Sequence, residues 1–161
     1  MKYLIYAFGI LFAIAVSMPG HAGTVTALTG DPVDHGYEGD NACCIDVAAV
    51  NILAYTAMQQ PELGIDVSDA GTAQDDFHAL WDPSGTQTVG NSQDFVSAME
   101  AMLFDMGLEA DMKIFSGTDL TYENLKSEWA KGERIVLLMF DQATGQGHAV
   151  FLWGLDEEAS T

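Results

Sequence analysis

The run from Cys44 to Tyr55 constrains the fold more than any other part of the sequence. Its residues favour a helix, and apolar side chains occupy most positions around that helix. A helix that is apolar on nearly all sides has to be buried, because a surface helix needs a polar face. Asp40 and Asn41 can cap its N-terminus, and Pro61 stops it. We therefore expect a domain built around one central helix.

Sequence periodicity predicts the other elements. Helices are expected at 74–80, 92–106 and 122–130, and strands at 110–115, 135–140 and 148–154. The last two strands form a hairpin across a glycine-containing turn. Helices followed by an antiparallel hairpin predict an α+β fold, with the buried helix packed on a C-terminal antiparallel sheet.

The N-terminal residues have the pattern of a secretory signal peptide. Lys2 gives a positive start, Tyr3 to Val16 is almost wholly apolar, and small residues precede an expected cleavage after Ala22. The apolar run of about 14 residues is shorter than the ~20 that a membrane-spanning helix needs. We therefore expect residues 1–22 to be removed and residues 23–161 to form one domain, secreted, periplasmic or on the cell surface, without a membrane span.

The charge balance excludes two classes of partner. The chain has 24 Asp and Glu against 5 Lys and Arg, a formal net charge of −19. Nucleic acids and anionic membrane surfaces would repel it. The acidic segments match neither zinc spacing nor the calcium-loop pattern, so no metal and no cofactor is expected. Loose calcium binding by Asp31 and Asp34, or by the stretch 66–76, is the alternative to solvated acidic loops.

Cys43 and Cys44 are the chain's two cysteines. Adjacent cysteines bridge only through a strained ring, so an ordinary structural disulfide is not expected. Three interpretations stay open: a reactive thiol beside a structural one, two buried structural thiols, or a vicinal redox pair. A thiol at a helix N-terminus ionises more readily, because free N–H groups and the helix dipole favour the anion. Cys44 is the preferred nucleophile and Cys43 its rival.

His148 begins the last predicted strand, about a hundred residues after Cys44. An imidazole beside a thiol can take up the thiol proton and return it later. The two residues together can therefore form an activated cysteine nucleophile. Asp40, Asp46 and the negative net charge oppose ionisation of the thiol, and only a close histidine would reverse their effect. The pair predicts a cysteine hydrolase, provided that the fold brings both residues together.

At these residues the chain resembles the papain-like cysteine peptidases. In that family the nucleophile is followed by small residues, a bulky apolar pair and an aromatic, here Val47-Ala48-Ala49, Ile52-Leu53 and Tyr55. The closer resemblance is to bacterial secreted endopeptidases of the immunoglobulin-degrading type, in the strand from His148 to Asp156. The chain is more loosely similar to bacteriocin-leader-processing peptidases. The resemblance covers about 13 residues around the cysteine and about 35 at the end of the chain.

The resemblance implies a fold and a set of roles. Cys44 would attack a peptide carbonyl of a protein or peptide substrate, and His148 would act as general base. The Cys44 N–H together with Asn41 would hold the oxyanion, and Asp156 would be the candidate to orient the histidine. Papain-like domains place the orienting residue further on, so we expect residues 23–161 to be an incomplete, truncated papain-like domain.

The sequence also departs from the family. Ile45 stands where the family usually has Gly, and Asp34 and Glu38 stand near the usual position of the Gln or Lys that holds the oxyanion. Asn41 or His35 would have to substitute for that donor. These departures keep two alternatives open: a non-catalytic papain-like extracellular binding domain, and a transglutaminase-like acyl transferase.

Overall fold

The computed structural model describes residues 10–17, 35–40, 43–84, 92–141 and 146–152. The helices are α1 (Cys44–Gln59), α2 (Ala70–Trp81), α3 (Ser92–Asp105) and α4 (Tyr122–Ala130). The strands are β1 (Ile10–Ser17), β2 (Asp111–Ser116), β3 (Arg134–Asp141) and β4 (Gln146–Phe151). Short 3-10 turns lie at Pro61–Leu63 and Gly117–Asp119. The predicted α+β composition is confirmed, and the helix expected at 74–80 is longer than predicted.

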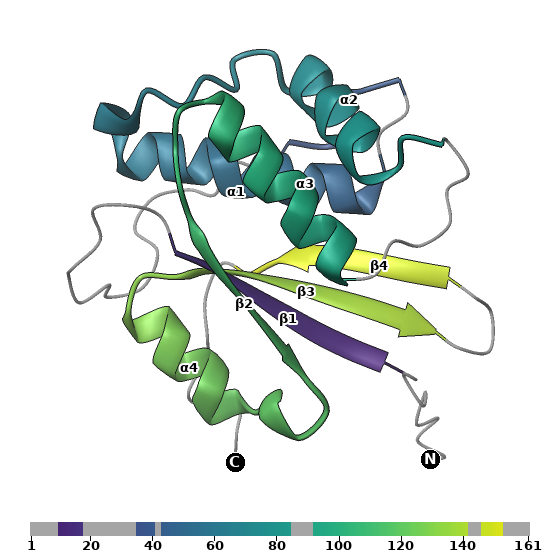
Figure 1. Cartoon of the computed structure of the whole chain (residues 1–161), viewed down its shortest axis with the longest axis vertical. Helices are drawn as coiled ribbons and strands as arrows, with labels where there is room; N and C mark the ends of the chain where they lie inside the picture. The colour runs from purple at the N-terminus through teal and green to yellow at the C-terminus, as the bar shows by residue number, and fades with distance from the viewer. Residues whose placement is uncertain (1–9, 18–34, 41–42, 85–91, 142–145, 153–161) are drawn as a thin grey trace, which may run out of the picture.

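The strands form one antiparallel sheet in the order β2-β1-β3-β4. α1, α2 and α3 cover one face of this sheet, and α4 lies against the other (Figure 1). In the described part of the chain β4 is an edge strand, paired only with β3. Its register sets His148 opposite Met139 and Ala149 opposite Leu138. Because α1 packs along β4, its N-terminus lies close to this edge.

α1 is the buried central helix that the sequence predicts. Ala49, Val50, Ile52 and Leu53 are inaccessible to solvent. They belong to a core that joins the three helices to the sheet side chains Val136, Leu138, Ala149 and Phe151. Polar side chains of α1 are also buried in this environment, and each of them therefore needs a hydrogen-bond partner.

A second, smaller core lies between the sheet and α4. Trp129 and Ile135 are buried there, with Leu125 and Leu137 packed against them. Leu125 and Trp129 are one helical turn apart on α4, so both side chains face this core. The Thr121 hydroxyl caps this helix by accepting the Asn124 N–H.

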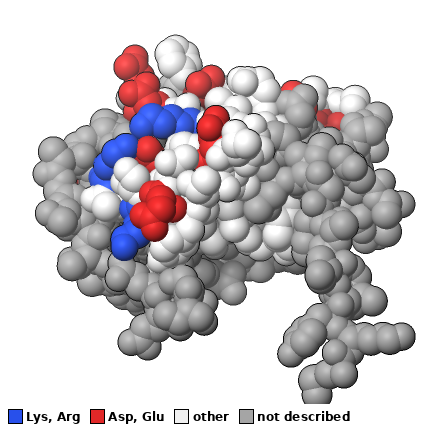
Figure 2. Space-filling view, turned by 90° about the horizontal axis from the view of Figure 1, so that it is seen from below, with Lys and Arg blue, Asp and Glu red and all other residues white. Residues whose placement is uncertain are grey.

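Lys and Arg side chains gather on the α4 side of the molecule (Figure 2). Lys113 and Lys131 both contact the buried Glu128, with N–O distances of 3.2 and 2.8 Å. Lys126 lies on α4. The guanidinium carbon of Arg134 lies over the Tyr55 ring, 5.0 Å from the ring centroid. None of these four cations lines the pocket described below.

Residues 10–17, within the predicted signal peptide, form β1 between β2 and β3. Ala13 lies opposite Phe115 on one side and Leu137 on the other. Removal of residues 1–22 would therefore take away the strand that joins β2 to the rest of the sheet. Cleavage after Ala22 stays a prediction. Within the described residues, no helix combines the length and apolarity needed to cross a bilayer.

Candidate active site

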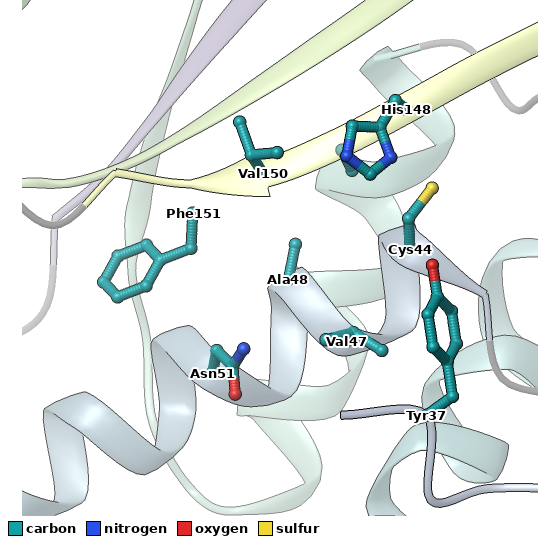
Figure 3. A pocket seen from close by; sticks show the side chains of 9 residues that line it. Tyr37, Cys44, Val47, Ala48, Asn51, His148, Val150 and Phe151 are labelled. Atoms are coloured by element: carbon teal, nitrogen blue, oxygen red, sulfur yellow. The ribbon is translucent and has the colours of Figure 1, made fainter. Parts of the chain in front are cut away.

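A pocket of about 210 Å³ lies where the N-terminus of α1 meets β4. Its polar residues come from three parts of the chain: Tyr37 from the segment before α1, Cys44 and Asn51 from α1, and His148 from β4 (Figure 3). Apolar side chains complete its walls: Val47, Ala48, Val150 and Phe151. The structure thus brings Cys44 and His148, distant in sequence, into one site.

Cys44 is the first residue of α1, and Cys43 before it is the N-cap, in extended conformation. The Cys43 N–H donates to the Asp46 carboxylate at 2.7 Å, which closes the helix N-terminus. The N-cap is Cys43, three residues after Asp40, so the prediction that Asp40 caps this helix is wrong. Asn41, the other predicted cap, lies outside the described residues. The N–H groups of Ile45 and Asp46 in the first helical turn face the Cys43 sulfur. Cys44 itself begins the helix, where the helix dipole favours an anion.

Hydrogen-bond donors around Cys44 favour its thiolate. The Cys43 S–H, the Ala149 N–H and the His148 ring all interact with its sulfur, and together they lower the Cys44 pKa to about 5, although partial burial opposes them. The edge position of β4 explains the Ala149 contact, because backbone groups on an outer edge have no neighbouring strand. Cys44 is therefore ionised at neutral pH.

The surroundings of Cys43 shift its pKa in the opposite direction. Its thiol donates to Cys44, it is partly buried, and the Asp46 carboxylate repels its anion. These three effects raise the Cys43 pKa, although the N–H groups of Ile45 and Asp46 oppose them. The sequence predicts that Asp46 opposes ionisation of Cys44. In the structure its charge acts on Cys43 instead. Both cysteines are free thiols, and the electrostatics favour Cys44 as nucleophile over its rival.

His148 reaches the site from the first half of β4, and its side chain is exposed. Its neighbours Ala149 and Phe151 are buried against α1. Asn41 and Asp156, the residues expected to hold the oxyanion and to orient the histidine, lie outside the described residues. His35, the other candidate oxyanion donor, faces Glu38 through a 3.1 Å contact of its ring nitrogen.

A second polar cluster lies behind the helix N-terminus and was not predicted. Asp46 is fully buried and accepts the Trp81 Nε1–H in addition to the Cys43 N–H, and its Oδ2 lies 3.0 Å from His78 Nδ1. His78 is buried on α2. The signal was available: His78 and Trp81 are one helical turn apart, at the end of the predicted 74–80 helix.

Cys43, Asp46 and His78 also have the composition of a metal site. Their ligand atoms lie within 4.8 Å of one another, the one such group among the described residues. However, the Asp46 oxygens are already occupied by the two N–H donors and the His78 ring. A buried carboxylate with this many partners is satisfied. The cluster therefore serves to join α2 to the N-terminus of α1.

Comparison of the chain with protein-family models, with curated proteins and with solved structures found no match.

Proposed function

We propose that this chain is a papain-like cysteine peptidase domain that hydrolyses peptide bonds in proteins or peptides. The observation that supports it best is the pairing of Cys44, whose surroundings favour the thiolate, with His148 in one pocket. A thiolate next to an imidazole is the arrangement that nucleophilic catalysis by cysteine requires. His148 is exposed and Cys44 is partly exposed, so a substrate segment can reach the sulfur.

The chemistry follows from these two groups. The Cys44 thiolate attacks the peptide carbonyl, an Sγ–C bond forms, and the carbonyl oxygen becomes an oxyanion. The C–N bond then breaks, and the amine leaves with a proton from His148. A water molecule next gives a proton to His148 and attacks the thioester carbon. The Sγ–C bond breaks, the carboxylic acid leaves, and the thiolate–imidazolium pair is restored.

The papain-like assignment is supported by the arrangement around the pair. The cysteine begins a buried helix, and the histidine lies on an antiparallel strand packed against that helix. This is the layout that the resemblance in sequence implies. The peptidase proposal does not depend on it, because the chemistry requires only the two side chains and an oxyanion donor.

A peptide library derived from a bacterial proteome tests this function whatever the cleavage specificity is. The full chain and its Cys44→Ala variant are incubated with the library at pH 7, and new termini are identified by mass spectrometry. Cleavages that appear with the wild type and disappear in Cys44→Ala support the proposal. Identical peptide sets from the two proteins would contradict it and favour the binding-domain alternative.

The acyl-transferase alternative is tested in the same preparation. A fluorescent primary amine and casein are added, and incorporation of the amine into casein is measured. Incorporation that depends on Cys44, without peptide cleavage, would replace the peptidase proposal by a transglutaminase-like one, because an amine would then take the place of water as acceptor of the acyl group.

We also propose that the domain functions outside the cytoplasm after removal of residues 1–22. Expression in a bacterial host, followed by intact-mass measurement of the exported chain, should give a product that begins at Gly23. A full-length exported chain would contradict this proposal. It would instead mean that β1 stays as the strand between β2 and β3.

A further inference from the structure

Tyr37 enters the pocket from a segment without helix or strand. Its side chain is 67% exposed, and its hydroxyl points toward Cys44 (Figure 3). An aromatic ring with so much exposure contributes little to the core. Its position beside Cys44 is therefore better explained by a role in the site than by stability.

The segment that bears Tyr37 is held on its N-terminal side by α1. The His35 N–H donates to Asn51 Oδ1 at 2.9 Å, and Asn51 Nδ2 donates back to the His35 carbonyl at 3.4 Å. Asn51 is buried on α1, two turns after Cys44. The same helix thus positions both the sulfur and the start of this segment.

A second buried amide holds the segment on both sides of Tyr37. The side-chain oxygen of Gln74, on α2, accepts the N–H groups of Glu38 and Gly39 at 2.9 and 3.0 Å. Its Nε2 donates to the Gly36 carbonyl at 2.8 Å. Gln74 has no solvent exposure, so these bonds are not exchanged for bonds to water, and they fix the backbone around Tyr37.

Tight packing against α2 adds to this constraint. A Cβ on Gly39 would lie 2.9 Å from the Gly71 carbonyl oxygen, and one on Gly71 would lie 2.9 Å from the Glu38 carbonyl oxygen. Only glycine allows the two backbones to approach so closely. The segment is therefore pre-positioned on the folded helices, although it forms no regular structure itself.

We propose that the Tyr37 hydroxyl, with the Cys44 N–H, donates a hydrogen bond to the oxyanion formed when Cys44 attacks an acyl carbonyl. This inference rests on the proposed function and supplies the donor for which the sequence offers Asn41 or His35. A pre-positioned donor stabilises the charge that develops in the transition state without reorganisation. Slight burial and the nearby thiolate raise the Tyr37 pKa, so its hydroxyl remains a donor at neutral pH.

Two reactions of the same sulfur separate this role from others. Acylation by p-nitrophenyl acetate passes through an oxyanion, whereas alkylation by iodoacetamide does not. In acylation an Sγ–C bond forms, the ester C–O bond breaks, and p-nitrophenolate is released and measured by its absorbance. Tyr37→Phe should slow acylation at least about tenfold, below the ~100-fold cost typical of a buried oxyanion donor because Tyr37 is exposed. Alkylation should stay within about twofold of the wild-type rate, since a substitution outside the thiolate's own contacts leaves its ionisation nearly unchanged.

The matched control is Tyr122→Phe, which removes an exposed hydroxyl at the start of α4. It should leave both rates unchanged. Equal rates of acylation in Tyr37→Phe and wild type would overturn the inference, and so would a wild-type Cys44 that p-nitrophenyl acetate does not acylate. Equal slowing of both reactions would also overturn it, because Tyr37 would then act on the ionisation of Cys44.

The test stands apart from the peptide-library experiment. A wild-type chain that is acylated in a Tyr37-dependent way but cleaves no peptide would support the oxyanion role and contradict the peptidase proposal. A chain that cleaves peptides equally well with Phe at position 37 would support the peptidase and overturn the role of Tyr37.

Discussion

The two sides of the α1 N-terminus contain similar side chains in different surroundings. On one side Cys43 lies with Asp46 and His78, between α1 and α2. On the other side Cys44 lies with His148 in the pocket. Both sites have a thiol and an imidazole, yet the Cys43 pKa is raised and the Cys44 pKa is lowered.

The difference lies in what else faces each thiol. Cys43 donates its S–H to Cys44, is partly buried and lies next to the Asp46 carboxylate, and these effects outweigh the N–H groups of Ile45 and Asp46 that face its sulfur. Cys44 is next to donors alone: the Cys43 S–H, the edge N–H of Ala149 and the His148 ring. A cysteine and a histidine side by side are therefore not enough for a nucleophile. The thiol that donates its S–H and lies beside a carboxylate stays protonated, and the thiol that accepts hydrogen bonds from its neighbours is ionised.

Exchange of each cysteine should give the largest effect. Cys44→Ala should abolish alkylation of the folded chain by iodoacetamide at pH 6 and any peptide cleavage, because the ionised thiol is removed. Cys43→Ser, which retains a hydroxyl donor toward Cys44, should keep most of both activities. The measurement is the alkylation rate by mass spectrometry, with the modified residue identified in a peptide digest. Alkylation of Cys43 ahead of Cys44 would reverse the comparison.

The pH dependence of alkylation measures the same difference directly. With the Cys44 pKa lowered to about 5, its thiolate is present above pH 5, and its reactivity is lost as pH falls through that value. An ordinary thiol would lose its reactivity near pH ~8.5 instead. In Cys43→Ala the midpoint should move upward, because the largest stabilising contact is gone. A wild-type midpoint above pH ~8 would contradict the assigned surroundings of Cys44.

Removal of the His148 side chain should change the ionisation of Cys44 less than it changes the rate of acyl transfer. His148→Ala takes away one of the contacts that lower the Cys44 pKa, so the alkylation midpoint should rise. Acyl transfer should fall by about 10²-fold or more, since the proton shuttle is lost. His35→Ala is the matched control, because its ring faces Glu38. Equal pH profiles for His148→Ala and wild type would exclude the pairing.

On the structural side, Asp46→Asn should lower the free energy of unfolding by about 2–4 kcal/mol, because a buried charged acceptor of several hydrogen bonds is lost. The control Asp66→Asn changes an exposed carboxylate that accepts the Ser68 N–H, and it should destabilise the fold far less. Urea denaturation followed by tryptophan fluorescence compares the two variants. A cost for Asp46→Asn no larger than for Asp66→Asn would mean that the cluster does not join α2 to α1.

Local patterns alone were enough to predict most of the secondary structure. The apolar run after Cys44 predicted the central helix, and the stop at Pro61 and the 122–130 helix were also correct. The hairpin strands agree with β3 and β4 within a few residues. These features depend on the period of apolar residues and on chain-breaking residues, which act over one or two turns. The place of residues 10–17 between two distant strands has no such local signal.

The site was only half predictable, for a physical reason. A helix N-terminus and a histidine at a strand start are visible in sequence, so Cys44 and His148 could be named as a pair. The choice of Cys44 over Cys43 depends on the donors that Cys43, Ala149 and His148 direct at the Cys44 sulfur. The position of Tyr37 depends on Gln74 of another helix. Electrostatic and hydrogen-bond contacts act through space over a few ångströms. The sequence by itself therefore determined which residues could react, and only the tertiary structure decided which of them face one another.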